Sequence, residues 1–272
     1  MKKRLKVKIP AITLLFILIS SVTVCAEGGS SDSLAFSVPV VNGFSYDIPE
    51  EANVDKSFYE ELEKAFIEKN ERYEAFKRTR AGYPDSINLA VTWQQQKNSY
   101  YCGPATATMI LNHTGYIHAT QDILAGPDYL RTTTDGTPWY SGTTQTAPYY
   151  FNMVHGLNTY HANNHNIYVN GCSYFVCNSG DTDEYIDKMM FTLSDYHAVP
   201  LFGQNLKGNL KSDLRYYVNS GHWLVLAGYT QSGAYFNVVD PASGIEGFEK
   251  VSQTYRVPQS EILEFAFRGI IW

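Results

Sequence analysis

The sequence has no internal repeat and no low-complexity tract, and after residue 24 it has no second long apolar run. Basic residues are in the minority, since 21 Lys and Arg stand against 27 Asp and Glu for a net charge of −6. That balance argues against a nucleic-acid partner, because nucleic acids are bound by basic surfaces. The 272 residues, 44% of them hydrophobic, suffice for one or two folded domains.

The N-terminus has the pattern of a secretory signal peptide. A basic start over residues 1–8 precedes an apolar run over 9–24, and Val24-Cys25-Ala26 offers the cleavage positions. We expect removal of residues 1–26, cleavage after Ala26, and a secreted protein without a stable membrane anchor. A lipoprotein modified at Cys25 is disfavoured because Val24 is bulky at that position. A retained membrane anchor is disfavoured because the apolar run is short for a span.

Cysteine is scarce, and removal of the signal peptide leaves Cys102, Cys172 and Cys177 of the four. Exported proteins can keep disulfides, and Cys172 and Cys177 are close enough in sequence to clip a small hairpin. Both could instead be reduced core residues. If they pair, Cys102 is the odd cysteine, which in a secreted protein is a candidate reactive thiol.

The mature chain divides into an extension and one domain. Residues 54–80 carry apolar residues at helical spacing among many charges, which predicts an amphipathic helix. It belongs to an N-terminal extension, 27–86, that is either a pro-segment covering a site or a helix packed on the domain. In the domain, 87–272, helices precede strands, which predicts an α+β fold. The expected helices are 103–113, 121–125, 148–157 and 183–193, and the expected strands are 89–93, 165–169, 174–176, 199–202, 223–229, 235–239 and 269–272.

Cys102 lies where a loop meets the first of these helices, in the stretch YYCGPATATMILN. Pro104 fits a first helical turn, where its missing N–H has no partner to lose. A helix N-terminus carries unpaired N–H groups and a partial positive charge, and both favour the reactive thiolate. The alternative is that Cys102 is a small buried residue, as cysteines often are.

A predicted hairpin, GHWLVLAGYTQSGAYFNVVDPASG, contains two further candidates. His222 opens its first strand and Asp240 ends its second. A turn centred near residue 231 would place them opposite each other, with Cβ atoms about 5 Å apart. The carboxylate would then fix the imidazole tautomer and favour its charged form, as a base and its orienting partner require. The alternative is a hairpin with two polar residues at its open end.

Gln96 is a candidate oxyanion donor. Attack on a carbonyl creates a negative oxygen that preplaced N–H groups must meet. The backbone N–H of Cys102 is one such group, and the side-chain amide of Gln96, six residues upstream, is a second. Gln94 and Gln95 carry the same chemistry, and a glutamine cluster in a loop is otherwise polar surface.

Together, Gln96, Cys102-Gly103-Pro104, Gly221-His222-Trp223 and Asp240-Pro241 resemble the papain-like cysteine peptidases, most of all the C-39-like relatives of the bacteriocin-leader-processing group. The order of these motifs and the spacing between them match those of the family over about residues 88–245. The resemblance implies a papain-like fold, in which a helix carrying the cysteine packs on an antiparallel sheet carrying the histidine and aspartate. It also implies Cys102 as nucleophile, His222 as base, Asp240 as orienter and Gln96 as oxyanion donor.

The resemblance does not extend to the substrate, because the best-known members sit on cytosolic transporters and cut double-glycine leaders. Here a signal peptide is present and transporter segments are not. We expect a secreted cysteine peptidase that hydrolyses peptide or cell-wall amide bonds through a Cys102 thioester. Two alternatives remain, a non-catalytic binding or adhesion protein on the same fold and an acyl transferase using the same site.

No cofactor and no metal are expected. His161 and His165 would have zinc-like spacing in a helix, but Asn163 and Asn164 between them favour a loop, and no third ligand is evident.

Overall fold

The computed structural model describes residues 56–79, 83–116, 118–139, 152–164, 173–218 and 220–272. All of them belong to one compact unit, Pro39–Trp272. The predicted signal peptide and the strand predicted over 165–169 lie outside the described residues. Within the described ranges, no helix combines the length and the apolar character that crossing a membrane requires.

The described strands form two antiparallel sheets. In the larger sheet, β1 (Ile87–Asn88), β4 (His222–Thr230), β5 (Tyr235–Val239) and β6 (Thr254–Pro258) follow one another, and β3 (Val199–Gly203) also pairs with β4. In the smaller one, β2 (Val176–Cys177) pairs with β7 (Ile270–Ile271). Strand β4 is buried at every position except Thr230, which explains why its sequence is an almost continuous apolar run.

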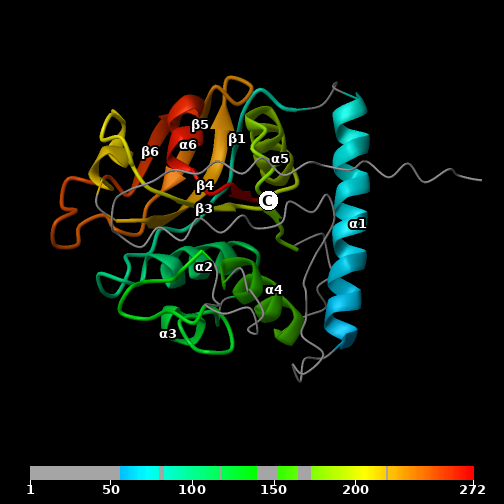
Figure 1. The fold of residues 1–272 in the computed structure, drawn as a ribbon, viewed down its shortest axis with the longest axis horizontal. Helices are drawn as coiled ribbons and strands as arrows, with labels where there is room; N and C mark the ends of the chain where they lie inside the picture. Colours follow the sequence, from blue (N-terminus) through cyan, green and yellow to red (C-terminus); the bar gives the residue numbers. More distant parts are fainter. Residues whose placement is uncertain (1–55, 80–82, 117, 140–151, 165–172, 219) are drawn as a thin grey trace, which may run out of the picture. The chain divides into compact units, whose positions relative to one another are not determined.

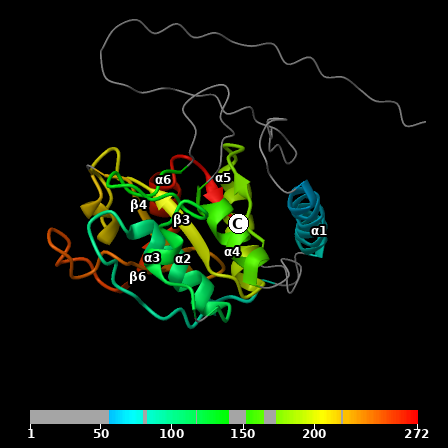
Figure 2. The ribbon, with the colours of Figure 1, turned by 90° about the horizontal axis from the view of Figure 1, so that it is seen from below.

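Helix α2 (Cys102–His113) is the buried helix of the domain. Its first ten residues are all buried, as expected of a helix that is apolar nearly all round. It packs against β4 and β3 and against its neighbours α3 (Gln121–Leu124) and α4 (Asn152–Asn164), which gather on the same side of the strands (Figures 1 and 2). After α4, the described helices are α5 (Thr182–Ser194), the short 3-10 helix η1 (Asp213–Tyr216) and α6 (Gln259–Phe265).

The α+β prediction is confirmed. In the structure, α2, which begins at Cys102, packs against β4, which begins at His222. Several local predictions were wrong. The strand expected over 89–93 ends at Asn88, because Val91 N donates to Leu89 O and turns the chain away from the sheet. Helix α4 runs through Asn163 to Asn164, where a loop was expected. Strand β6 and helix α6 were not anticipated.

Helix α1 (Lys56–Thr79) matches the helix predicted for the extension. Its buried face includes Tyr73, whose ring meets those of Phe191 and Trp272 edge-on at 5.7 and 5.5 Å. On the same face, Nζ of Lys69 donates to the carbonyl of Ser173 at 2.7 Å. Helix α1 thus packs on the domain, and a pro-segment role for the extension stays a prediction.

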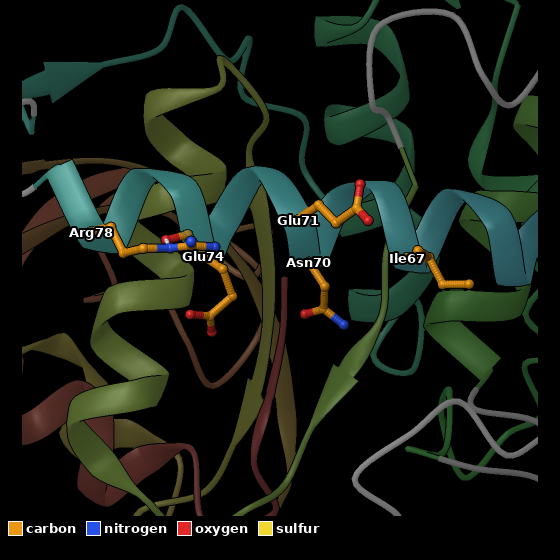
Figure 3. A pocket seen from close by; sticks show the side chains of 5 residues that line it. All are labelled: Ile67, Asn70, Glu71, Glu74 and Arg78. Atoms are coloured by element: carbon orange, nitrogen blue, oxygen red, sulfur yellow. Dashed lines mark hydrogen bonds between the residues drawn. The ribbon is translucent and has the colours of Figure 1, made fainter. Parts of the chain in front are cut away.

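The outer face of α1 bears a pocket (Figure 3). Its described lining comes from this helix alone and consists of Ile67, Asn70, Glu71, Glu74 and Arg78. The candidate catalytic side chains are not among these residues, so the pocket is separate from the site described below.

We expect Tyr73→Ala to lower the free energy of unfolding by about 3 kcal/mol, because it removes a buried ring and leaves a cavity between α1 and the domain. Chemical denaturation of the full chain measures this. Ile67→Ala is the matched control, since Ile67 lies on the same helix but is 49% exposed. Its effect should stay within about 0.5 kcal/mol. Equal stabilities for the two variants would mean that α1 is not docked as described.

Candidate active site

Cys102 is the first residue of α2 and a free thiol, 8% exposed. The N-cap residue, Tyr101, makes no side-chain cap hydrogen bond, so no side chain at the cap shields the positive end of the helix from the thiol. Gly103 is required for close packing, since a Cβ there would lie 2.3 Å from Oγ1 of Thr137. Burial alone would also fit an inert cysteine, and the neighbours of the thiol therefore decide its role.

His222 and Asp240 are hydrogen-bonded in the structure, with Nε2 of the imidazole 2.8 Å from Oδ1 of the carboxylate. Both side chains are buried, His222 at 4% exposure and Asp240 at 0%. His222 begins β4 and Asp240 follows the last residue of β5. The hairpin thus joins the two predicted residues into a buried imidazole–carboxylate pair.

The register that produces this pair differs from the predicted one. The turn occupies four residues, 231–234, and its first residues, Gln231 and Ser232, both have φ of 52°. Thr230 therefore pairs with Tyr235, and continuing the ladder would place Leu224, not His222, opposite Asp240. His222 reaches the carboxylate diagonally, two residues along the same face.

A β-bulge makes that diagonal contact available. The ladder shifts between Leu226 and Gly228, so that Ala227 is an extra residue in β4. Because side chains alternate between the faces of a sheet, one extra residue moves His222 to the face that Asp240 occupies. Without the bulge the two side chains would point to opposite faces.

The imidazole of His222 also interacts with the thiol of Cys102. Burial by itself lowers the pKa of His222, but the charge of Asp240 and hydrogen bonds to Asp240 and Cys102 outweigh burial and raise that pKa to about 9. Since Nε2 is engaged by Asp240, Nδ1 is the nitrogen left for the thiol. An imidazole in this position is the base that nucleophilic catalysis by a cysteine requires.

Asp240 is stabilised as a carboxylate by four donors. Oδ1 accepts from His222 and from the backbone N–H of Ala242 at 3.0 Å. Oδ2 accepts from the hydroxyls of Tyr217 and Tyr255, each at 2.7 Å. Burial raises the pKa of Asp240, but the charge of His222 and these hydrogen bonds hold it below its usual value. The carboxylate is thus charged although it has no contact with solvent.

Sequence reasoning missed both tyrosines. Tyr217 follows η1, and Tyr255 lies in β6, a strand that was not predicted. Nothing in the sequence distinguishes these two among 21 tyrosines. The only available signal would have been correct placement of β6 beside β5, which brings Tyr255 level with Val238 and close to Asp240.

Gln96 is tied to the same region through its backbone. It is 4% exposed, and its N–H donates to the carbonyl of Pro241 at 2.9 Å, next to Asp240. Its Nε2 donates to the carbonyl of Asn98 at 2.7 Å, which leaves the second N–H of the amide for another acceptor. Gln95 instead donates Nε2 to the carbonyl of Ser243 at 2.9 Å. The oxyanion role of Gln96 stays a prediction.

Gln96→Ala is expected to lower kcat/KM by about a hundredfold, the usual cost of one oxyanion donor. Steady-state kinetics on a cleaved peptide measures it. Gln95→Ala is the control and should lower kcat/KM less than tenfold, because the oxyanion role is assigned to Gln96, whereas Gln95 donates to the carbonyl of Ser243. A larger loss in Gln95→Ala than in Gln96→Ala would reassign the donor.

The structure also bears on the cysteines predicted to pair and on the histidines with zinc-like spacing. Cys177 is a free, buried thiol, 3.6 Å from Nζ of Lys188, so it forms no disulfide in this structure; Cys172 lies outside the described residues. His161 lies in α4, whereas His165 is outside the described residues. Within the described ranges, no group of three or more His, Cys, Asp or Glu could hold a metal ion.

Comparisons with known proteins identify the family of the chain. The model of the Peptidase_C39 like family matches residues 88–260. Xylellain, a cysteine protease from Xylella fastidiosa, is 12% identical, with 72% of this chain and 86% of that chain covered and a TM-score of 0.36. A fragment of prointerpain A from Prevotella intermedia is 17% identical, with 80% and 83% covered and a TM-score of 0.30. No curated protein matches. The fold is therefore assigned from the structure of this chain and from the family match.

Proposed function

The chain belongs to the Peptidase_C39 like family and is a cysteine peptidase, and we propose that Cys102, His222 and Asp240 are its nucleophile, base and orienting carboxylate. One observation carries the assignment. The thiol at the start of α2 acts on the buried imidazole of His222, whose Nε2 is held by a buried carboxylate. This is the arrangement that nucleophilic catalysis by a thiol requires.

The reaction follows from these positions. The thiolate of Cys102 attacks the carbonyl carbon of the scissile amide, and the negative oxygen receives hydrogen bonds from the backbone N–H of Cys102 and the free N–H of Gln96. The imidazolium of His222 gives its proton to the leaving amine, and a thioester remains. Neutral His222 then takes a proton from water, whose oxygen attacks the thioester, and the C–S bond breaks to release the acid and restore the thiolate beside the imidazolium. Asp240 keeps Nδ1 aimed at the reacting atoms throughout, because it holds Nε2.

The substrate and its location form the finer part of the proposal. We place the enzyme outside the cell on the strength of the signal-peptide pattern over residues 1–26. An exported cysteine peptidase meets proteins, peptides and cell-wall peptides, and we propose that it hydrolyses amide bonds in these. No nucleic-acid partner and no membrane anchor on the mature chain are proposed.

A digest of two substrate pools tests this function. The full chain is incubated with a mixed peptide library and with peptidoglycan stem peptides, and new carboxyl and amino termini are identified by mass spectrometry. Hydrolysis of either pool, with none in Cys102→Ala, supports the proposal. Retention of intact ligand without cleavage would instead indicate a binding protein. Products joined to an added amine, with no hydrolysis, would indicate an acyl transferase.

A further inference from the structure

Two phenol hydroxyls converge on the one oxygen of Asp240 that His222 does not use. Tyr217 and Tyr255 come from different parts of the chain and each donates to Oδ2 at 2.7 Å. The ring of Tyr217 also lies flat on the imidazole of His222, with centroids 4.0 Å apart and planes 7° apart. On the ring of Tyr217, Phe248 stacks at 5.2 Å.

We propose that Tyr217 and Tyr255 are positioning residues of the catalytic site, which keep Asp240 charged and aimed at His222, and that Tyr217 also fixes the plane of the imidazole. This inference rests on the proposed function of Cys102, His222 and Asp240. Neither tyrosine is assigned a contact with substrate. Each acts through Asp240, and Tyr217 acts through His222 as well.

The physical reason is the cost of a buried carboxylate. Asp240 has no access to water, so each lone pair without a donor destabilises its charged form. Donors on Oδ2 remove that cost and also stop the carboxylate from rotating away from Nε2. A single donor would leave Oδ2 partly satisfied, whereas two phenols from different parts of the chain hold it in place.

The two phenols stay protonated, and therefore stay donors, over the whole working range of pH. Burial, and then the charge of Asp240, raise the pKa of Tyr217 and of Tyr255 above the usual value. The titratable groups that act on this cluster are His222, Cys102 and Asp213. A change in pH therefore acts on the site through the carboxylate, the imidazole and the thiol.

Loss of either phenol donor should make Cys102 reactivity more sensitive to acid. A hydrogen bond to a carboxylate favours its charged form and lowers its pKa, so removing one donor raises the pKa of Asp240. As pH falls, the variant carboxylate becomes protonated earlier, and His222 loses the charge that stabilises its imidazolium. The acid limb of Cys102 reactivity should therefore move to higher pH, while reactivity near neutral pH changes little.

Alkylation by iodoacetamide measures this without any knowledge of the substrate. The rate constant at Cys102 is followed by mass mapping between pH 4 and 9 in Tyr217→Phe, Tyr255→Phe and the double variant. We expect about a tenfold loss at pH 5 in each single variant, a larger loss in the double variant, and less than about a threefold change at pH 7.5. Tyr229→Phe is the matched control, since its buried hydroxyl bonds to Ser194 at 3.0 Å, and its profile should equal that of the parent chain.

A separate variant tests whether the ring of Tyr217 fixes the plane of the His222 imidazole. Tyr217→Leu removes the hydroxyl and the flat ring, so it should react more slowly than Tyr217→Phe at every pH. Equal profiles for these two would overturn the role of the ring. Should Tyr217→Leu fail to fold, the phenylalanine variants still test the hydroxyls.

Failure of this inference is distinguishable from failure of the proposed function. If the parent chain shows fast alkylation in mild acid and both phenylalanine variants superimpose on it, the tyrosines are merely structural. If Cys102 in the parent chain itself titrates as an ordinary thiol, the proposed catalytic pair is wrong and the inference falls with it.

Discussion

Cys102→Ala is expected to abolish hydrolysis, with kcat lower by about 10⁴-fold or more. The reason is that the mechanism needs a covalent thioester, and no other side chain in the assembled site can form one. The variant should still bind substrate, because alanine is smaller than cysteine and leaves the rest of the site in place. Single-turnover measurements at saturating substrate separate these two effects.

Cys177→Ala is the matched control for that experiment. Cys177 is also free and buried, but it lies against Lys188 and not in the hairpin site. Burial raises the pKa of its thiol, which makes it a poor nucleophile. Its turnover should remain within about threefold of the parent chain once loss of folded protein is corrected for. Residual turnover in Cys102→Ala close to that of the parent would remove Cys102 from the mechanism.

His222→Ala should be nearly as severe, with kcat lower by about 10³-fold or more, because the thiol loses both its base and its ion partner. Asp240 would also keep a buried charge without its cationic partner, and stability should fall as well. Steady-state kinetics on protein shown to be folded by circular dichroism measures the catalytic part. Turnover that survived in His222→Ala would direct attention to His113, His118, His155 and His197 as the base.

Asp240→Asn provides a graded comparison, with a loss between those of Gln96→Ala and His222→Ala. An asparagine amide nitrogen must replace one carboxylate oxygen. If it replaces Oδ1 it faces the N–H of Ala242, and if it replaces Oδ2 it faces two phenol hydroxyls. Either orientation sets donor against donor, in addition to removing the charge that favours the imidazolium. A fully active Asp240→Asn would show that the charge is not needed.

The elements that carry the site could be read from local patterns. Strands β4 and β5 have long runs of β-branched and apolar residues around a turn, and α2 is apolar with proline in its first turn. Short-range signals of this kind fixed the candidates Cys102, His222 and Asp240. They also located the turn at the right place in the chain.

The register and the supporting residues could not be read in the same way. The four-residue turn and the bulge at Ala227 each shift the pairing of β4 with β5. The turn alone would place His222 and Asp240 on opposite faces of the sheet, and the bulge returns them to the same face. Tyr255 comes from β6, an edge strand of only five residues. Tyr217 reaches Asp240 only through tertiary folding. Contacts between residues distant in sequence leave no periodic pattern, so neither tyrosine could be singled out.

The most direct test of the Cys102–His222 pair is the pH dependence of Cys102 alkylation by iodoacetamide in the parent chain and in His222→Ala. At pH 5.5 an unperturbed thiol, with a pKa of about 8.5, is only about 0.1% thiolate. We predict that the parent chain reacts at that pH at least about a hundredfold faster than His222→Ala, and that the variant follows a simple thiol titration. Identical profiles that both rise only toward pH 8.5 would contradict the account, because they would mean that no imidazolium stabilises the thiolate.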